Sequence, residues 1–307
     1  MGKPSCFFLS ILELALHNNS RKMEVTSAVG DLQKRIKSLQ LKPLGFVPTM
    51  GALHQGHLSL VRKAIDECPL AVVSIYINPT QFNDKDDLKN YPRTIQSDLE
   101  LLGSVLRKND IVFAPDDKEV YPEEDNRVFH FGNLDKVMEA LHRPGHFNGV
   151  AQVVSRLFDI VKPDNAYFGL KDFQQLAVIK ELVKQTGSNV RIIRCPIVRE
   201  PDGLAMSSRN RFLEKEIRKK APVIYKTILN ASRMITERDI PEIKGYVRKT
   251  IEKEKGFSLG YFEIVDDSEL IPVKEVKEME FTKHYFGCIA VKAGKIRLID
   301  NIEITMG

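Results

Sequence analysis

The chain lacks a run of apolar residues long enough to cross a membrane. The best candidate, Phe7 to Leu16, is short and is interrupted by Glu13, whereas a membrane helix needs about 20 apolar residues. The same segment makes a poor signal peptide, because it has one lysine and no clear small-residue cleavage site. We expect no membrane partner, and we interpret residues 1–22 as a disordered extension, a tag or a misassigned start before a folded part that begins at Met23.

Cysteine is scarce, and its spacing excludes two classes of protein. The four cysteines are scattered along the chain without any CxxC pair: Cys6, Cys68, Cys195 and Cys288. A disulfide framework and a zinc site both require closer or more regular spacing. Free thiols suit a reducing compartment, so the sequence predicts a cytoplasmic protein.

The chain also lacks a strong excess of one charge. Its formal net charge is +5 over 307 residues, which suits anionic substrates but is too mild to indicate nucleic-acid binding without a clustered basic face. An RNA-binding module would need aromatic platforms for stacking, and the lysines of the C-terminal helices have no such aromatic pattern beside them. The composition, 43% hydrophobic and 28% charged, is that of an ordinary globular protein without repeats.

A glycine-rich turn lies between a predicted strand and a predicted helix. The apolar run 44–47 precedes the segment 50–57, and an amphipathic pattern follows at 58–65. The N-terminus of a helix exposes unpaired N–H groups and the positive end of the helix dipole, so it binds phosphate readily. Gly51 and Gly56 have no Cβ atom, which lets a ligand approach the backbone closely. The segment therefore predicts a phosphate-binding turn.

His54 and His57 lie in this turn, three residues apart, and fall on one side if the helix begins near residue 54. Two imidazoles at this place can donate hydrogen bonds to phosphate oxygens. The alternatives are a metal pair or two surface histidines, although zinc would need three or four ligands and no cysteine or carboxylate lies at ligand spacing. His-x-Gly-His is typical of class I aminoacyl-tRNA synthetases and related nucleotidyltransferases, which activate a carboxylate or phosphate with a nucleoside triphosphate.

A second candidate segment follows the continuous apolar run 70–77, which predicts a strand buried on both faces of a parallel sheet. Asn78 and Gln81 come directly after it. Ligands in open α/β sheets bind beyond the carboxyl ends of the strands, so both side chains are candidates for substrate binding. Alternatively, the Asn-Pro pair only forms a turn.

Three further polar residues have two interpretations each. Asp98 lies in the first turn of a helix expected at 95–107 after the N-cap Thr94, and it either binds Mg²⁺ or favours the helix dipole. Arg143 and His146 lie in a predicted loop dense in glycine, proline and polar groups. They either contact a substrate carboxylate or phosphate, or are solvated loop residues.

Two later segments carry phosphate-binding chemistry. Lys171 offers a point charge for phosphates at the entrance of a predicted helix, and Asp172 beside it can cap that helix or accept from a ribose hydroxyl. Gln175, one turn on, can bind a polar substrate. The segment 199–210 combines two serines with arginines and predicts a phosphate clamp, with a serine-capped helix start as the alternative.

The remaining patterns predict an α/β fold with two domains. The first, residues 23–200, is a Rossmann-like parallel sheet, with further helices at 25–41, 150–161 and 176–184, strands at 111–114, 165–168 and 190–198, and surface β structure with loop at 126–135. The second, residues 201–307, is a small α+β domain with basic amphipathic helices at 215–236 and 240–255 and short strands at 261–265, 286–291 and 297–304.

Six segments of the chain match motifs of one known family and occur in that family's order: residues 48–57, 78–82, 91–94, 143–147, 168–175 and 202–210. On these motifs the chain from Met23 to Gly307 resembles the pantothenate synthetase (pantoate–β-alanine ligase) family. The resemblance implies a Rossmann-like domain of the class I nucleotidyltransferase and synthetase type, a small C-terminal lid domain and a homodimer. It implies that pantoate attacks the α-phosphate of ATP, with Mg²⁺ required, and that β-alanine then attacks the pantoyl adenylate to give pantothenate and AMP.

The resemblance also implies roles for single residues. Gln81 would bind pantoate and β-alanine, Gln175 would bind pantoate, and Asn78 would line the same pocket. Catalytic roles fall to His54, His57 and Lys171, with His57 in the position usually described as the proton donor. Contacts to ATP would come from Met50, Gly51, Ala52, Leu53, His54, Gln55, Gly56, His57, Gly169, Leu170, Lys171, Asp172, Val198, Met206, Ser207, Ser208 and Arg209.

The sequence departs from the family pattern at Leu170, where a glutamate is usual. A backbone contact to the nucleotide survives this change, but a polar side-chain contact is lost. The rival interpretations are another adenylyl- or cytidylyltransferase with the same phosphate turn, and an inactive homologue. The pantoate-specific glutamines argue against the first, and the two histidines, Lys171 and the serine pair argue against the second.

Overall fold

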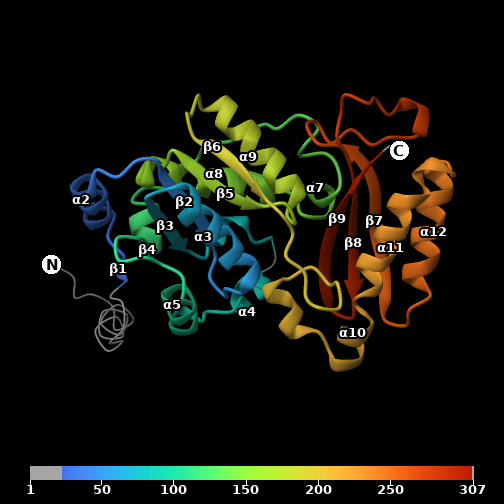
Figure 1. Ribbon diagram of the computed structural model, residues 1–307, viewed down its shortest axis with the longest axis horizontal. Helices are drawn as coiled ribbons and strands as arrows, with labels where there is room; N and C mark the ends of the chain where they lie inside the picture. The colour runs from blue at the N-terminus through green and yellow to red at the C-terminus, as the bar shows by residue number, and fades with distance from the viewer. Residues whose placement is uncertain (1–22, 84, 306–307) are drawn as a thin grey trace. The chain divides into compact units, whose positions relative to one another are not determined.

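The computed structural model describes residues 23–83 and 85–305, which form two compact units (Figure 1). The first unit comprises the described residues up to Phe129, together with Gly145–Phe168 and Ile179–Cys195. The second comprises His130–Pro144, Gly169–Val178 and the described residues from Pro196 onward. The predicted extension, residues 1–22, lies outside the described residues, and the predicted domain limits at 23–200 and 201–307 stay a prediction.

A six-stranded sheet with the strand order β1-β4-β3-β2-β5-β6 forms the centre of the first unit. The neighbours from β1 to β5 pair in parallel, which confirms the Rossmann-like sheet. The residues at the start of β3 are all fully buried, as expected for a strand covered on both faces. The strands are β1 (Glu24–Thr26), β2 (Leu44–Thr49), β3 (Leu70–Ile75), β4 (Ile111–Phe113), β5 (Asn165–Gly169) and β6 (Arg191–Cys195).

Helices connect the parallel strands, as parallel pairing requires. Helix α3 joins β2 to β3 and buries Leu58, Val61 and Ala64 in the core of the first unit. Its apolar positions lie three apart, which places them on one face of the helix. The helices up to β6 are α2 (Val29–Leu39), α3 (Gln55–Glu67), α4 (Lys85–Asn90), α5 (Ile95–Gly103), α6 (Asp117–Val120), α7 (Glu139–His142), α8 (His146–Val161) and α9 (Phe173–Gln185).

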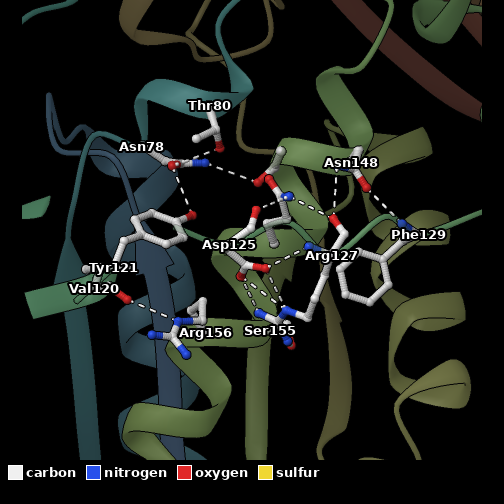
Figure 2. A network of polar contacts seen from close by, with 12 residues as sticks. Asn78, Thr80, Val120, Tyr121, Asp125, Arg127, Phe129, Asn148, Ser155 and Arg156 are labelled. Atoms are coloured by element: carbon white, nitrogen blue, oxygen red, sulfur yellow. Dashed lines mark hydrogen bonds and ion pairs between the residues drawn. The ribbon is translucent and has the colours of Figure 1, made fainter. Parts of the chain in front are cut away.

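Two predictions near the edges of this sheet were wrong. The helix predicted at 25–41 begins only at Val29, because Val25 instead pairs with Val112 in strand β1; the open side of β4 supplies the partners for this β-branched segment. The described residues of the segment 126–135 contain no strand. Their backbone groups bond to side chains of α8 instead, for example through the Asn148 side-chain oxygen, which accepts from the Phe129 N–H at 2.8 Å (Figure 2).

The second unit is built on a three-stranded antiparallel sheet in the order β7-β8-β9, comprising β7 (Phe257–Asp266), β8 (Tyr285–Ala293) and β9 (Ile296–Ile304). Helices α11 (Val223–Arg233) and α12 (Ile240–Glu252) pack against it (Figure 1). The helix predicted over 215–236 is broken into α10 (Lys215–Lys220) and α11, because Pro222 cannot donate a backbone hydrogen bond. The predicted α+β character of this region is confirmed.

None of the helices in the described part of the chain is both long and apolar enough to span a lipid bilayer.

Asp110 anchors the turn before β4. Its carboxylate is fully buried and accepts from the Ala71 N–H at 2.9 Å and from the Arg107 guanidinium at 2.9 and 3.0 Å. Removing it leaves these donors without their acceptor, so Asp110→Ala should lower the free energy of unfolding by about 2–4 kcal/mol. Urea denaturation measures this change.

The matched control is Asp31→Ala, which removes a carboxylate of the exposed ion pair with Lys34. An exposed pair near a helix N-terminus contributes at most about 1 kcal/mol. Equal losses in the two variants would contradict the anchoring role of Asp110.

Candidate active site

The turn after β2 is shaped by two left-handed residues and a histidine cap. Gly51 has φ +77° and Ala52 has φ +50°, after which the chain extends through His54 and enters α3 at Gln55. The His54 Nδ1 atom accepts from the Gly56 N–H at 3.1 Å, and the His57 Nδ1 atom accepts from the His54 N–H at 3.2 Å. This reciprocal capping satisfies two backbone donors of the first helical turn.

The capping also fixes the chemistry of both imidazoles. Because each Nδ1 atom accepts a hydrogen bond, the neutral ring carries its proton on Nε2. The two rings lie close together, with centroids 4.1 Å apart. His54 and His57 can therefore present two N–H donors to one anion beside the N-terminus of α3.

Asp98 holds this turn from the first turn of α5. Its side chain is 2% exposed, and its two oxygens accept from the Ala52 N–H at 2.9 Å and the Leu53 N–H at 2.8 Å. Thr94 occupies the N-cap position as predicted, but its hydroxyl makes no capping bond and donates to Asp98 at 3.3 Å. These contacts stabilise the left-handed backbone at Ala52, which a residue other than glycine seldom adopts.

A metal role for Asp98 stays a prediction. Within residues 23–83 and 85–305, no three or more side chains of histidine, cysteine, aspartate or glutamate are grouped to hold a metal ion. Mg²⁺, however, is commonly bound by one or two carboxylates together with substrate phosphates and water, so the residues present are compatible with a cation that is held mainly by a nucleotide.

The segment after β3 lies beside the histidine turn, since β2 and β3 pair in parallel with Thr49 opposite Ile75. Asn78 directly precedes the single turn η1 (Pro79–Gln81), Gln81 is its last residue, and both are buried. The Gln81 amide nitrogen lies 2.9 Å from the Met50 sulfur atom. The structure therefore brings Met50, Asn78 and Gln81 together at one edge of the sheet.

His146 belongs to a helix and not to the predicted loop. Helix α8 begins at His146, four residues before the predicted start. The imidazole is buried, and its Nδ1 atom lies 2.7 Å from the backbone oxygen of Gln81. His146 thus joins the group at the end of β3, which excludes the interpretation that it is a solvated residue.

Gly149, also in α8, is a contributor that the sequence patterns missed. A Cβ atom there would lie 2.6 Å from the Thr80 backbone oxygen and 2.9 Å from the Gln81 Cα atom. Its carbonyl oxygen accepts from the Asn78 amide at 3.1 Å. A glycine directly before the helix predicted at 150–161 was the available signal for such a close approach.

The second unit holds the other predicted nucleotide contacts. The turn between β5 and α9 carries Lys171 and Asp172, whose side chains lie 3.4 Å apart. The Asn301 amide of β9 donates to the carbonyl oxygens of Leu170 and Lys171 at 2.9 and 3.1 Å. Asn301, which the sequence patterns also missed, therefore fixes the backbone of this turn, and Gln175 follows in the first turns of α9.

The predicted clamp after β6 is a folded-back segment. The Met206 N–H donates to the Val198 carbonyl oxygen at 3.0 Å, which pairs two of the predicted ATP contacts. The Ser207 hydroxyl accepts from the Arg209 N–H at 3.2 Å and caps the turn η2 (Ser208–Phe212), so the serine-capped start is confirmed. Arg143, also in this unit, follows the short helix α7.

Arg199 anchors this segment to β9. Its guanidinium lies 3.7 Å from the centroid of the Tyr225 ring and pairs with the Asp300 carboxylate at 2.6 and 3.0 Å. Burial raises the pKa of Asp300, while the charge of Arg199 opposes that shift. Asp300 and Asn301 are sequence neighbours in the middle of β9, so one stretch of this strand supports both segments of the second unit that are predicted to contact the nucleotide.

The close approach at Gly149 generates a stability prediction. Because the added methyl group of Gly149→Ala would collide with backbone atoms of η1, which cannot rotate away, we expect a loss of about 1–3 kcal/mol in the free energy of unfolding. Thermal or urea unfolding measures it. The control Gly245→Ala changes a glycine of α12 with no atom within 4 Å of the added Cβ and should stabilise by about 0.5–1 kcal/mol. Effects of the same sign would argue against the close packing.

Comparisons with known proteins point to one family. A family model described as pantoate-beta-alanine ligase matches residues 24–303. The pantothenate synthetase of Bacteroides thetaiotaomicron is 48% identical over 283 residues, which cover 92% of this chain and 99% of that protein. The pantothenate synthetase of Phocaeicola vulgatus is 49% identical over 284 residues, with the same coverage.

Two solved structures are similar over nearly the whole described chain. The pantothenate synthetase of Thermus thermophilus has a TM-score of 0.84 at 39% identity and covers 92% of this chain and 100% of that one. The pantoate-beta-alanine ligase of Francisella tularensis, complexed with beta-gamma ATP and beta-alanine, has a TM-score of 0.75 at 36% identity and covers 93% of this chain and 99% of that one.

Proposed function

The chain belongs to the pantoate-beta-alanine ligase family, and from that premise we propose that it condenses pantoate with β-alanine by way of a pantoyl adenylate. The observation that supports this most directly is the placement of the capped histidine pair beside Asn78 and Gln81, at the carboxyl ends of the neighbouring strands β2 and β3. One edge of the sheet thus offers phosphate donors and buried amides next to each other. Such an edge suits a reaction between a triphosphate and a small polar acid.

In the first step a carboxylate oxygen of pantoate attacks the α-phosphorus of ATP, and the bond to the β-phosphate oxygen breaks to release pyrophosphate. In the second step the amine of β-alanine attacks the acyl carbon, loses a proton and displaces AMP. The products are pantothenate, AMP and pyrophosphate. The sequence offers no evident covalent nucleophile and the reaction needs none, so catalysis rests on alignment and charge stabilisation.

The first step brings two anions together, so the enzyme has to stabilise negative charge. His54 and His57 would donate to the phosphates from Nε2, since Nδ1 of each ring caps α3. Lys171 and Arg209 of the second unit, which the family resemblance assigns to ATP, would contribute fixed positive charge. Mg²⁺ would neutralise phosphate charge when bound, with Asp98 as the candidate protein ligand.

The amides at the end of β3 would hold the acid. Gln81 and Asn78 are buried and polar, and both are held by neighbours on η1 and α8. Gln175 of the second unit would contribute a further amide to pantoate, and Arg143 would supply a charge for its carboxylate. His146 would act on the pocket through its contact with the Gln81 backbone oxygen.

Two wider features belong to the same proposal. The adenylate is prone to hydrolysis, so closure of a lid formed by residues 201–307 would protect it from water. The family resemblance predicts a homodimer.

The histidine assignment is tested by pantoate-dependent exchange of labelled pyrophosphate into ATP, measured without β-alanine. Wild-type protein should catalyse exchange that needs pantoate and Mg²⁺. His57→Ala should lower the rate by about a hundredfold or more, the scale for a lost transition-state donor. His57→Asn should lower the exchange rate by a similar factor. Because asparagine keeps a polar atom near the position of Nδ1 to cap α3, this variant separates a loss of catalysis from a loss of folding.

The control for this experiment is His284→Ala, which removes an exposed histidine paired with Glu303. Its exchange rate should equal that of the wild type. A near-normal rate in His57→Ala would refute the assignment of His57, and no exchange by folded wild-type protein would refute pantoate as the acid.

The role of Asp98 is tested by Asp98→Asn at varied Mg²⁺. Because both carboxylate oxygens accept backbone N–H groups of the histidine turn, an amide nitrogen in place of one oxygen should distort the turn and raise the KM for ATP about tenfold, on the scale of one hydrogen bond to a charged group. If Asp98 acts only through the turn, the Mg²⁺ concentration for half-maximal exchange at saturating ATP stays unchanged. A large rise in that concentration would instead make Asp98 a metal ligand.

A further inference from the structure

The orientation of the Asn78 side-chain amide follows from its four neighbours, of which Figure 2 labels Thr80 and Tyr121. Its Nδ2 atom lies 3.1 Å from the Gly149 carbonyl oxygen, which can only accept, so the amide nitrogen must face α8. The Oδ1 atom then faces the hydroxyl groups of Tyr121 and Thr80, each at 3.2 Å. Both hydroxyls must therefore donate to it.

The same arrangement orients Gln81. The Asn78 Nδ2 atom lies 3.4 Å from the Gln81 Oε1 atom, which accepts from it. The Gln81 amide nitrogen consequently points the other way, toward the Met50 sulfur atom at 2.9 Å. A flip of the Asn78 amide would place two acceptors against each other, both at Gln81 and at Gly149.

Tyr121 is well placed to prevent that flip. It follows α6 directly, and the preceding carbonyl oxygen, that of Val120, accepts from the Arg156 guanidinium of α8 at 3.1 Å (Figure 2). Burial raises the pKa of Tyr121 to about 12, so the phenol keeps its proton and remains a donor at neutral pH. A neighbouring tyrosine, Tyr76, lies at a ring-centroid distance of 6.4 Å but donates to a different acceptor, Asp117, at 2.9 Å.

We propose that Tyr121 is a positioning residue for the acid substrate: with Thr80 it fixes the Asn78 amide, and through Asn78 it fixes the direction in which Gln81 presents its own amide. Tyr121 itself touches no substrate in this arrangement. Its effect is on the affinity for pantoate and not on the affinity for ATP. This inference rests on the proposed function, in which Asn78 and Gln81 bind pantoate.

The test is Tyr121→Phe, which removes the hydroxyl and keeps the ring, measured by the pyrophosphate exchange assay. The KM for pantoate should rise about 3- to 10-fold, the effect of one neutral hydrogen bond, while the KM for ATP changes by less than about twofold. Thr80→Val removes the second donor to the same oxygen and should act in the same way. In the double variant the KM for pantoate should rise by more than the product of the two single increases, because only then has the Asn78 oxygen lost both donors.

Tyr76→Phe is the matched control, since it also removes a buried tyrosine hydroxyl next to Tyr121 without touching Asn78. Its KM for pantoate should stay within about twofold of the wild type. The proposal is overturned if Tyr121→Phe behaves like Tyr76→Phe, or if the KM for pantoate and the KM for ATP rise together. Should Tyr121→Phe fail to fold, Thr80→Val tests the same acceptor. The wild-type exchange rate is measured before that of any variant, and absence of pantoate-dependent exchange in the wild type refutes the proposed function.

Discussion

The parallel pairing of β2 with β3 is the constraint on which the candidate site in the first unit depends. With Thr49 opposite Ile75, the two strands end together, so the histidine turn and the Asn78 segment leave the sheet at the same edge. Met50 and Gln81 then lie within contact of each other although 31 positions separate them in the chain. A shift of the register by one residue would turn each strand's side chains to the other face, and it would separate these two groups.

Buried polar side chains that bond to backbone atoms hold the turns of the candidate site in place, as apolar packing holds the sheets. Asp98 receives two N–H groups of the histidine turn, and Asn301 binds two carbonyl oxygens of the Lys171 turn. Burying a carboxylate such as that of Asp98 is costly unless each oxygen finds a partner, and both of its oxygens do. Once the partners are in place, the same low-polarity surroundings strengthen each bond and leave the turn a single conformation.

The elements that could be predicted from the sequence are those with a local physical cause. The apolar run of β3 and the spacing of Leu58, Val61 and Ala64 in α3 predict a buried strand and an amphipathic helix, and both are found. The wrong predictions concern segments whose secondary structure depends on a partner that is distant in the sequence. Val25 joins a strand because β4 has an open side, and residues 126–135 form no strand among the described residues, because side chains of α8 bind their backbone.

The sequence by itself predicted which residues carry the chemistry, because the histidine pair, the glycines and the helix start act over a few neighbouring positions. It also identified the family, since six motifs in fixed order leave little room for another assignment. Only the tertiary structure decided what supports these residues. Tyr121, Gly149 and Asn301 lie 43, 71 and 131 positions from the groups that they hold, and such contacts depend on strand register and helix packing, which local spacing does not encode.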